Sequence, residues 1–341
     1  MEIQLLLIKW YKENLRALPW RENKNPYSIW LSEIILQQTQ VVQGQPYYER
    51  FIEKYPTVND LAKAKEDEVL KLWQGLGYYS RARNLHFAAK QIINDFDGIF
   101  PNNYTDLLKL KGVGEYTAAA VASIAYNEVV PSVDGNVLRV ISRLFDIDIP
   151  VDSSEGKKII KDLMYEIIDQ KNPGDFNQAV MELGAKICKP KNPDCINCPL
   201  QEKCLSLENK TYLNRPIKSK KTKINNIYID YILFINRNKI VIQQRDSRSI
   251  WKNLFEFPNV TSESNFKDLT HLNSLLKQYS KTIKPLLLQK EIVHKLTHRN
   301  LHIRFFRCEI PDINSSQFIS LEEALKKAVP KPIEDFLKEI H

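Results

Sequence analysis

The sequence predicts a multidomain protein in which an all-α domain precedes a C-terminal α+β domain. Three observations predict this fold class. The length of 341 residues corresponds to two domains at roughly 150 residues each. Apolar residues recur at i, i+3 and i+4 over residues 1–205, and they alternate with polar residues beyond residue 226. We therefore predict domains at 1–205 and 226–341, joined by a linker over 206–225.

The composition excludes several classes of protein. Hydrophobic residues make up 43% and charged residues 26%, the balance of a soluble globular protein. No stretch approaches the roughly 18 consecutive apolar residues of a membrane helix. The first ten residues lack the apolar run and cleavage site of a secretory signal, so we expect a cytoplasmic chain.

Charge favours a polyanionic partner. Lys and Arg outnumber Asp and Glu by 49 to 41, which gives a net charge of +8. Much of the excess lies in the linker, whose basic residues are Lys210, Arg215, Lys218, Lys220, Lys221 and Lys223 and whose acidic residue is Glu208.

In the first domain, amphipathic helices are clearest from Ile29 to Gln40 and from Leu85 to Asn94. The boundaries between helices are predicted at turn residues, namely Pro26, Pro56 and Thr57, Gly75 and Gly77, Asp97 and Gly98, Gly112 and Gly114, Asp134 and Gly135, and Pro173 and Gly174.

In the second domain, 228–234 and 239–243 alternate around an Asn-Arg-Asn turn and predict a hairpin. Residues 301–307 predict another strand, and 264–279 predict a helix. A last helix is predicted after Ser320, because Glu323 three residues later completes a capping box.

Residues 108–120 have the pattern of a helix-hairpin-helix. Gly112 and Gly114 flank Val113, and a helix rich in small residues follows. The glycines allow the backbone to approach a nucleic-acid phosphate, aided by the amides of the following helix. The alternative is a tight turn between two packed helices.

Two acidic residues are candidates for catalysis. Asp134 precedes an apolar-periodic helix, where backbone donors would keep its carboxylate ionised. Glu33 lies among apolar neighbours, which would raise its pKa if it is buried. Carboxyl groups with such different environments form the acid and stabiliser pair that cleavage at an anomeric carbon requires. The alternative is a capping Asp and a solvated Glu.

Four of the five cysteines predict a metal site rather than a disulfide framework. Cys188, Cys195, Cys198 and Cys204 have the spacing C-x6-C-x2-C-x5-C. This set can hold a zinc ion or an iron-sulfur cluster, and the spacing does not decide between them. The fifth, Cys308, lies in an apolar strand and is expected to be a buried thiol.

Taken together, these motifs resemble the adenine DNA glycosylases of the helix-hairpin-helix superfamily, the MutY family, over essentially the whole chain. The motifs that carry the resemblance are Leu18 to Arg21, Ser32 to Thr39, Gly75 to Asn84, the hairpin, Val133 to Val140, Glu182 to Ala185, and the four cysteines.

The resemblance implies removal of adenine mispaired with 8-oxoguanine or guanine in double-stranded DNA, after the base is flipped out of the duplex. It implies that Glu33 protonates adenine N7 and that Asp134 stabilises or traps the oxocarbenium ion. Asn136 would orient Asp134, and Tyr116 would assist at the sugar. Tyr116 stands where endonuclease III has a lysine, so the resemblance implies a monofunctional enzyme.

The resemblance also implies the binding residues. The adenine pocket would be lined by Arg16, Leu18, Trp20, Arg21 and Glu182. Residues beside the lesion would be Gln38, Thr39, Leu76 and Tyr78, and the DNA-backbone contacts would be Gly112, Val113 and Gly114. The four cysteines would hold one 4Fe-4S cluster, and we expect a monomer associated with the nucleoid.

The second domain resembles the Nudix-like module of this family. Residues 251–258 are similar to the approach to a Nudix box, but 259–264 lack its glycine and clustered glutamates. The resemblance therefore implies recognition of 8-oxoguanine rather than pyrophosphate hydrolysis. Where family members commonly have Phe-Ser-His, this chain has Leu296, Thr297 and His298. A non-catalytic lesion binder and an endonuclease III-like lyase are the alternative functions.

Overall fold

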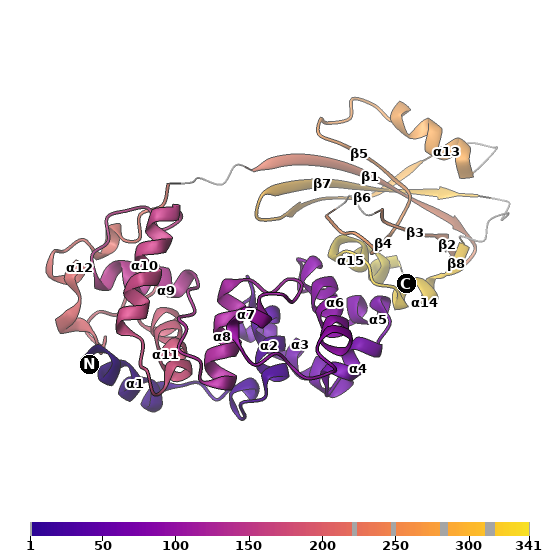
Figure 1. Cartoon of the computed structure of the whole chain (residues 1–341). Coiled ribbons are helices and arrows are strands. Elements are labelled where there is room, and N and C mark those ends of the chain that lie inside the picture. The colour runs from indigo at the N-terminus through magenta and orange to yellow at the C-terminus, as the bar shows by residue number, and fades with distance from the viewer. Residues whose placement is uncertain (1, 220–223, 247–249, 280–285, 311–317, 341) are drawn as a thin grey trace. The chain divides into compact units, whose positions relative to one another are not determined.

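The computed structural model describes residues 2–219, 224–246, 250–279, 286–310 and 318–340. Its contacts divide the chain into two units (Figure 1). Unit 1 comprises Met1–Ala64 and Asn84–Lys221, and unit 2 comprises Lys65–Arg83 and Thr222–His341. The segment Lys65–Arg83 thus comes from within the helical part of the sequence but groups with the C-terminal part.

Unit 1 is helical, as predicted. Its helices are α1 (Glu2–Asn14), α2 (Pro26–Leu36), α3 (Val41–Lys54), α4 (Val58–Lys63), most of α6 (Ser80–Asp95), α7 (Tyr104–Leu107), α8 (Glu115–Tyr126), α9 (Gly135–Leu144), α10 (Ser154–Ile167), α11 (Pro173–Lys186) and α12 (Leu205–Glu208). Short 3-10 helices lie at Pro19–Arg21, Gln201–Lys203 and Tyr212–Asn214. The helix expected from 29 to 40 ends four residues early, because the chain turns after Leu36 and Gln38 has a positive φ.

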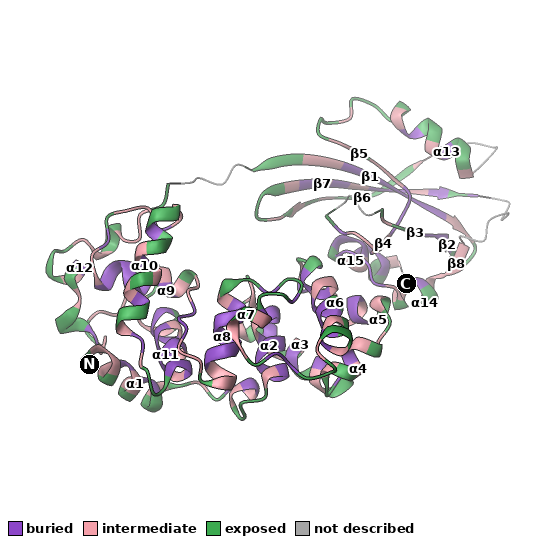
Figure 2. Ribbon diagram, viewed as in Figure 1, coloured by how far each residue is buried: buried purple, intermediate pink, exposed green. Residues whose placement is uncertain are grey.

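The core of unit 1 forms around α8 and α11, which are largely buried (Figure 2). Residues 117–123 of α8 are all buried, and most are small, so α2 and α11 pack closely against it. Helix α9 buries Val137, Val140, Ile141 and Leu144 in a core that also includes residues of α1, α10 and α11. Helix α2, which carries Glu33, and the cap of α9 at Asp134 are therefore held by packed helices.

Unit 2 contains a six-stranded sheet with the order β6-β7-β1-β2-β8, in which β5 also pairs with β1. The strands are β1 (Asn225–Asn236), β2 (Lys239–Val241), β5 (Asn259–Ser262), β6 (Leu287–Lys295), β7 (Arg299–Glu309) and β8 (Phe318–Ser320). Strands β1 and β7 are parallel, and the other pairs are antiparallel. A separate ribbon joins β3 (Gln243–Gln244) to β4 (Phe255–Glu256).

Most of the predicted elements of this unit are confirmed. The hairpin is β1–β2, with Asn236 opposite Lys239 across a two-residue turn. The strand at 301–307 lies within β7, and the capping box of Ser320 and Glu323 begins α14 (Leu321–Lys326). Cys308 is buried in β7, at 1% exposure.

The helix expected at 264–279 is shorter than predicted. Only the 3-10 turn Thr270–Leu272 and α13 (Asn273–Tyr279) are helical. The carboxylate of Asp268 accepts a hydrogen bond from the backbone N–H of Thr270, which favours a turn over an earlier helix start.

Two further helices complete unit 2: α15 (Lys331–Ile340) near the C-terminus, and α5 (Glu66–Leu72) from the inserted segment. Phe336 of α15 stacks on Phe305 of the sheet at 4.3 Å between ring centroids. Among the helices that the structure describes, none is long and apolar enough to cross a membrane.

Candidate active site

Glu33 and Tyr116 form the centre of the candidate site. Helix α2 begins where Asn25 accepts hydrogen bonds from the N–H groups of Tyr27 and Ser28, and it places Glu33 opposite the first turn of α8. There the Tyr116 hydroxyl donates to Glu33 Oε2 at 2.6 Å. Burial raises the pKa of Glu33 to about 7; the tyrosine hydrogen bond opposes this shift, and the nearby Asp134 adds to it. The predicted pKa rise is therefore confirmed.

Asp134 is the N-cap of α9. Its Oδ1 accepts hydrogen bonds from the backbone N–H groups of Asn136 and Val137, both at 2.8 Å, and its Oδ2 accepts from Asn136 Nδ2 at 2.7 Å. Burial nevertheless raises the pKa of Asp134 above its ordinary value, against the effect of these donors. The donors expected to keep the carboxylate ionised are present and lower its pKa, but desolvation is the larger effect.

Arg139 supports this cap and was not identified from the sequence. Its Nη2 donates to Asn136 Oδ1 and to the carbonyl of Gly184, both at 2.8 Å, and its Nε donates to the carbonyl of Cys188 at 2.7 Å. Arg139 follows Asn136 by three residues, a spacing that places two side chains next to each other on a helix. This spacing could have indicated the contact from the sequence. The side chain connects the Asp134 cap to α11 and to the loop that follows it.

Three of the five residues expected around an adenine pocket, Arg16, Arg21 and Glu182, are brought together by ion pairs. The Glu182 carboxylate is 1% exposed and pairs with Arg16 Nε at 2.5 Å and with Arg21 Nη2 at 2.9 Å. Although burial alone would raise the pKa of Glu182, its hydrogen bonds and charge interactions with the two arginines lower it. Leu18 and Trp20 are buried beside the arginines in sequence, at 6% and 7% exposure.

Gln38 and Thr39 follow the end of α2 in a sharp turn. Gln38 has φ of 57° and is exposed, and Thr39 Oγ1 donates to the carbonyl of Gln37 at 3.3 Å. The neighbouring Gln37 donates through Nε2 to Thr117 Oγ1 of α8 at 3.2 Å, a contact that sequence reasoning missed. This contact fixes the turn against the helix that carries Tyr116.

The helix-hairpin-helix lies between α7 and α8. Gly112 has φ of +79°, and a Cβ there would lie 2.6 Å from the Cβ of Asn84. Val113 is buried at 7%, and Gly114 is the N-cap of α8. The first N–H groups of α8 therefore follow a turn that strongly favours glycine, which suits an anion-binding backbone.

In unit 2, the expected lesion-reading residues lie around one cavity. Tyr78 has φ of 47°, is 48% exposed, and contacts the Thr297 hydroxyl through its own hydroxyl. Leu76 is buried, and His298 is exposed in the turn between β6 and β7. These four residues line a cavity of about 520 Å³ together with Trp251, His294 and others. The contact between Tyr78 and Thr297 was not predicted.

The four clustered cysteines follow α11 in one loop. Burial raises the pKa of Cys198 to about 12, and the other three thiols add to this rise. The buried Arg143 donates to Cys188 Sγ at 3.3 Å and to the carbonyl of Lys189. Across the residues the structure describes, no three His, Cys, Asp or Glu side chains are arranged to hold a metal ion.

The first part of the basic linker is packed on unit 1. Arg215 pairs with Asp146 at 2.9 Å, and Ser219 donates to Asp152 at 2.9 Å through its backbone N–H. Lys220, Lys221 and Lys223 lie outside the described residues.

Two family models match different parts of the chain. Residues 31–164 match the HhH-GPD superfamily of base excision DNA repair proteins, and residues 230–339 match the NUDIX domain. A solved structure of a thermostable thymine-DNA glycosylase is similar, with a TM-score of 0.56 and 31% identity. The similarity covers 61% of this chain and 95% of that one.

Among curated relatives, the adenine DNA glycosylase of Buchnera aphidicola subsp. Schizaphis graminum is 35% identical over 98% of this chain and 97% of its own length. The human adenine DNA glycosylase is 42% identical over 58% of this chain and 38% of its own length. The similarity to the first of these spans both units, as the motifs in both units indicated. The chain therefore belongs to the adenine DNA glycosylase (MutY) family and is a DNA glycosylase of base excision repair.

Proposed function

We propose that this enzyme removes adenine opposite 8-oxoguanine or guanine in double-stranded DNA, as a monofunctional glycosylase, by protonating adenine N7. The observation that carries the proposal is the pKa of Glu33, raised to about 7 beside a second, more heavily hydrogen-bonded carboxyl group. Glu33 is the general acid because a substantial fraction of it is protonated near neutral pH. Protonation at N7 makes the base a better leaving group.

Asp134 acts on the sugar. Two backbone N–H groups and the Asn136 amide hold its carboxyl group in one orientation, so Asn136 and Arg139 are positioning residues. A carboxylate fixed in this way stabilises the positive charge that develops at the anomeric carbon or traps it covalently. Preorganisation matters here because the group does not have to reorient as the bond breaks.

Tyr116 supports a monofunctional reaction. Its hydroxyl donates to Glu33. Burial raises the pKa of this hydroxyl well above its ordinary value, and the neighbouring carboxyl groups add to the rise. The side chain therefore stays a neutral phenol that can position Glu33 and approach the sugar. A phenol cannot form the Schiff base through which an amine cleaves the strand, so the abasic product is left uncut.

Binding residues are assigned by their surroundings. The buried Glu182 fixes the guanidinium groups of Arg16 and Arg21. The adenine pocket is therefore assigned to these three residues together with Leu18 and Trp20. The base stack beside the lesion is contacted by Gln38, Thr39, Leu76 and Tyr78. Gln38 and Tyr78 have positive φ, which is typical of residues in functional turns. Gly112, Val113 and Gly114 meet the DNA backbone, and Thr297 and His298 read the lesion.

The spacing of the four cysteines and the buried cation of Arg143 beside Cys188 support a thiolate-bound group in this loop, although the described side chains are not arranged around a metal ion in this structure. Cys188, Cys195, Cys198 and Cys204 would hold one 4Fe-4S cluster, whose contribution is to organise the loop and its fold. We propose further that the enzyme acts as a monomer associated with the nucleoid.

The test is base release by Glu33→Gln under single-turnover conditions, from duplexes containing A:8-oxoG, A:G and thymine glycol. The amide keeps the shape of the pocket but delivers no proton, so mispair binding should persist while base release is lost. Glu166→Gln, at an exposed position of α10, is the matched control and should retain wild-type rates.

Two results would contradict the proposal. The first is a near wild-type rate of adenine release by Glu33→Gln. The second is strand cleavage without alkali, or release of thymine glycol by the wild-type enzyme, which would favour the endonuclease III-like alternative.

A further inference from the structure

We propose that Lys71, Gln74 and Tyr79 are positioning residues for lesion discrimination, because they hold the loop that carries Tyr78 against the C-terminal part of unit 2. Tyr78 and Thr297 then meet the mispair as one element. This inference rests on the proposed function, since it concerns the preference for A:8-oxoG over A:G.

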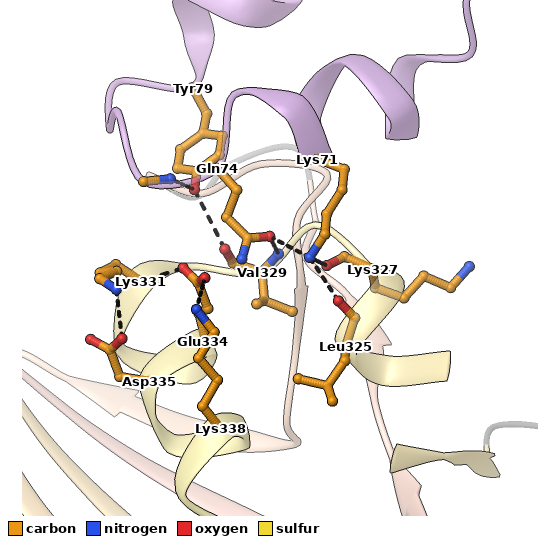
Figure 3. Close-up of polar contacts among 11 residues, drawn as sticks. Lys71, Gln74, Tyr79, Leu325, Lys327, Val329, Lys331, Glu334, Asp335 and Lys338 are labelled. Atoms are coloured by element: carbon orange, nitrogen blue, oxygen red, sulfur yellow. Dashed lines mark hydrogen bonds and ion pairs between the residues drawn. The ribbon is translucent and has the colours of Figure 1, made fainter. Parts of the chain in front are cut away.

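Unit 2 is built from two parts of the chain that are far apart in sequence. Lys65–Arg83 belongs by its contacts to the same unit as the C-terminal sheet, although it is far from that sheet in sequence. This segment contains α5 and the loop 75–79, which lines the 520 Å³ cavity together with the β6–β7 turn. The polar contacts that attach it to the C-terminal residues are drawn in Figure 3.

Lys71 makes the central contacts. Its ammonium group donates to the carbonyl of Leu325 at 2.7 Å, the carbonyl of Lys327 at 3.1 Å and Gln74 Oε1 at 3.1 Å (Figure 3). Three acceptors match its three N–H donors. The two carbonyls lie at the end of α14, where a helix leaves its last carbonyls without partners of its own, so a cation here satisfies groups that the helix leaves open.

Gln74 and Tyr79 extend the contact to the chain between α14 and α15. Gln74 Oε1 also accepts from the backbone N–H of Val329 at 3.3 Å. The Tyr79 hydroxyl donates to the carbonyl of Val329 at 3.4 Å and accepts from the backbone N–H of Gly75 at 3.3 Å. Tyr79 is only 3% exposed, so this hydroxyl joins the start of the loop to the C-terminal residues in a buried setting.

The loop itself is held from within. Trp73 Nε1 and Arg81 Nη2 both donate to the carbonyl of Gly77, at 3.0 and 3.3 Å. The loop has three residues with positive φ, namely Gly75, Gly77 and Tyr78. Few backbone conformations are compatible with this pattern. Movement of its base would therefore carry Tyr78 with it.

The two ends of the segment are attached as well. Asn253 Nδ2 donates to Glu66 Oε1 at 2.6 Å, and Arg83 Nη1 donates to the carbonyl of Lys252 at 2.9 Å. These contacts keep the segment attached when Lys71 is changed, so the Lys71 variant is expected to loosen the loop without releasing it.

The experiment compares the efficiency of adenine release at limiting enzyme from A:8-oxoG and A:G duplexes. Lys71→Met removes three hydrogen bonds at the base of the loop and should lower the preference for A:8-oxoG by roughly three- to tenfold, about the worth of one hydrogen bond between the loop and the lesion. Its rate on A:G at saturating enzyme should be unchanged, because the loop takes no part in the chemical step. Lys65→Met, at the residue before α5, is the matched control and should keep the full preference.

A double-variant cycle separates positioning from a merely structural role. If Lys71 acts through Tyr78 and Thr297, Lys71→Met should have no further effect on the preference in a Thr297→Val background. Multiplicative effects in the double variant would overturn the proposal, as would a wild-type preference in Lys71→Met. Tyr79→Phe, which removes only the bridging hydroxyl, gives the same test if Lys71→Met does not fold.

The wild-type enzyme distinguishes the two levels of inference. Absence of adenine release from both duplexes would contradict the proposed function itself. Equal adenine release from the A:8-oxoG and A:G duplexes would mean that the enzyme does not discriminate the lesion, and it would contradict this inference. A wild-type preference that the Lys71 and Tyr79 variants retain would contradict only the positioning role.

Discussion

The two carboxyl groups of the candidate site differ in their hydrogen bonds rather than in the direction of their pKa. Burial raises both pKa values, but Glu33 accepts one hydrogen bond from a phenol, whereas Asp134 accepts three, two of them from the backbone. The donors favour the ionised form of Asp134. The division of labour between an acid and a stabiliser follows from this difference.

The pKa of Glu33 sets the expected pH dependence. Glu33 must be protonated to act, and its folded-state pKa is raised to about 7, so base release should be fastest below about pH 7 and fall as the pH rises through that value. Single-turnover rates across this range measure the effect. Residual release by Glu33→Gln should lack this dependence, and a wild-type rate that rises with pH would contradict the assignment.

Arg139 gives a second prediction for a single residue. Arg139→Leu removes the partner of the Asn136 amide oxygen, so Asn136 and Asp134 lose a fixed orientation. Base release should fall roughly tenfold, the effect of about one charge-assisted hydrogen bond, while mispair binding is retained. Equal decreases in binding and rate would instead mean that Arg139 supports only the fold of α9.

At the scale of elements, the sequence predicted the helices, the hairpin and the capping box at Ser320 because these depend on local patterns. It did not predict the end of α2 at Leu36, since the apolar periodicity continues past the turn that Gln37 stabilises by bonding to Thr117. Contacts between elements, such as Tyr78 with Thr297, leave no local signal.

The hairpin glycine tests one element directly. Gly112→Ala should weaken binding to an abasic-analogue duplex and lower the melting temperature, because φ is +79° and the new Cβ would meet Asn84 at 2.6 Å. Gly98→Ala is the control, since φ is +76° there but the nearest atom is 3.6 Å away. Only the first variant should lose DNA binding. Equal DNA affinity of the two variants would show that the hairpin does not contact the DNA.

The cysteine loop allows a similar comparison. The purified protein should be yellow-brown and contain iron and sulfide, and Cys198→Ser should be poorly folded because the thiolates organise the loop. Cys308→Ala, at a buried position of β7, should keep its iron. One equivalent of zinc without iron or sulfide would show that the spacing serves a different metal.

At the scale of the whole molecule, the order of the motifs along the chain was sufficient to indicate the family and both fold classes. It could not show that Lys65–Arg83 belongs to unit 2, because the polar contacts that join it to residues 325–329 depend on side chains with no sequence periodicity. The insertion makes the proposed lesion-reading surface a product of two distant parts of the chain.

The basic linker gives the prediction at this scale. Arg215 pairs with Asp146, so the substitutions are made at the lysines that follow it in the linker. Replacing Lys218, Lys220, Lys221 and Lys223 by Gln should weaken duplex binding and flatten its dependence on salt, by about 0.9 in the log–log slope for each phosphate that is no longer neutralised. The control replaces four lysines of unit 1, Lys9, Lys12, Lys63 and Lys90. Both variants remove the same charge, so a common slope would mean that net charge matters and the linker makes no contact of its own.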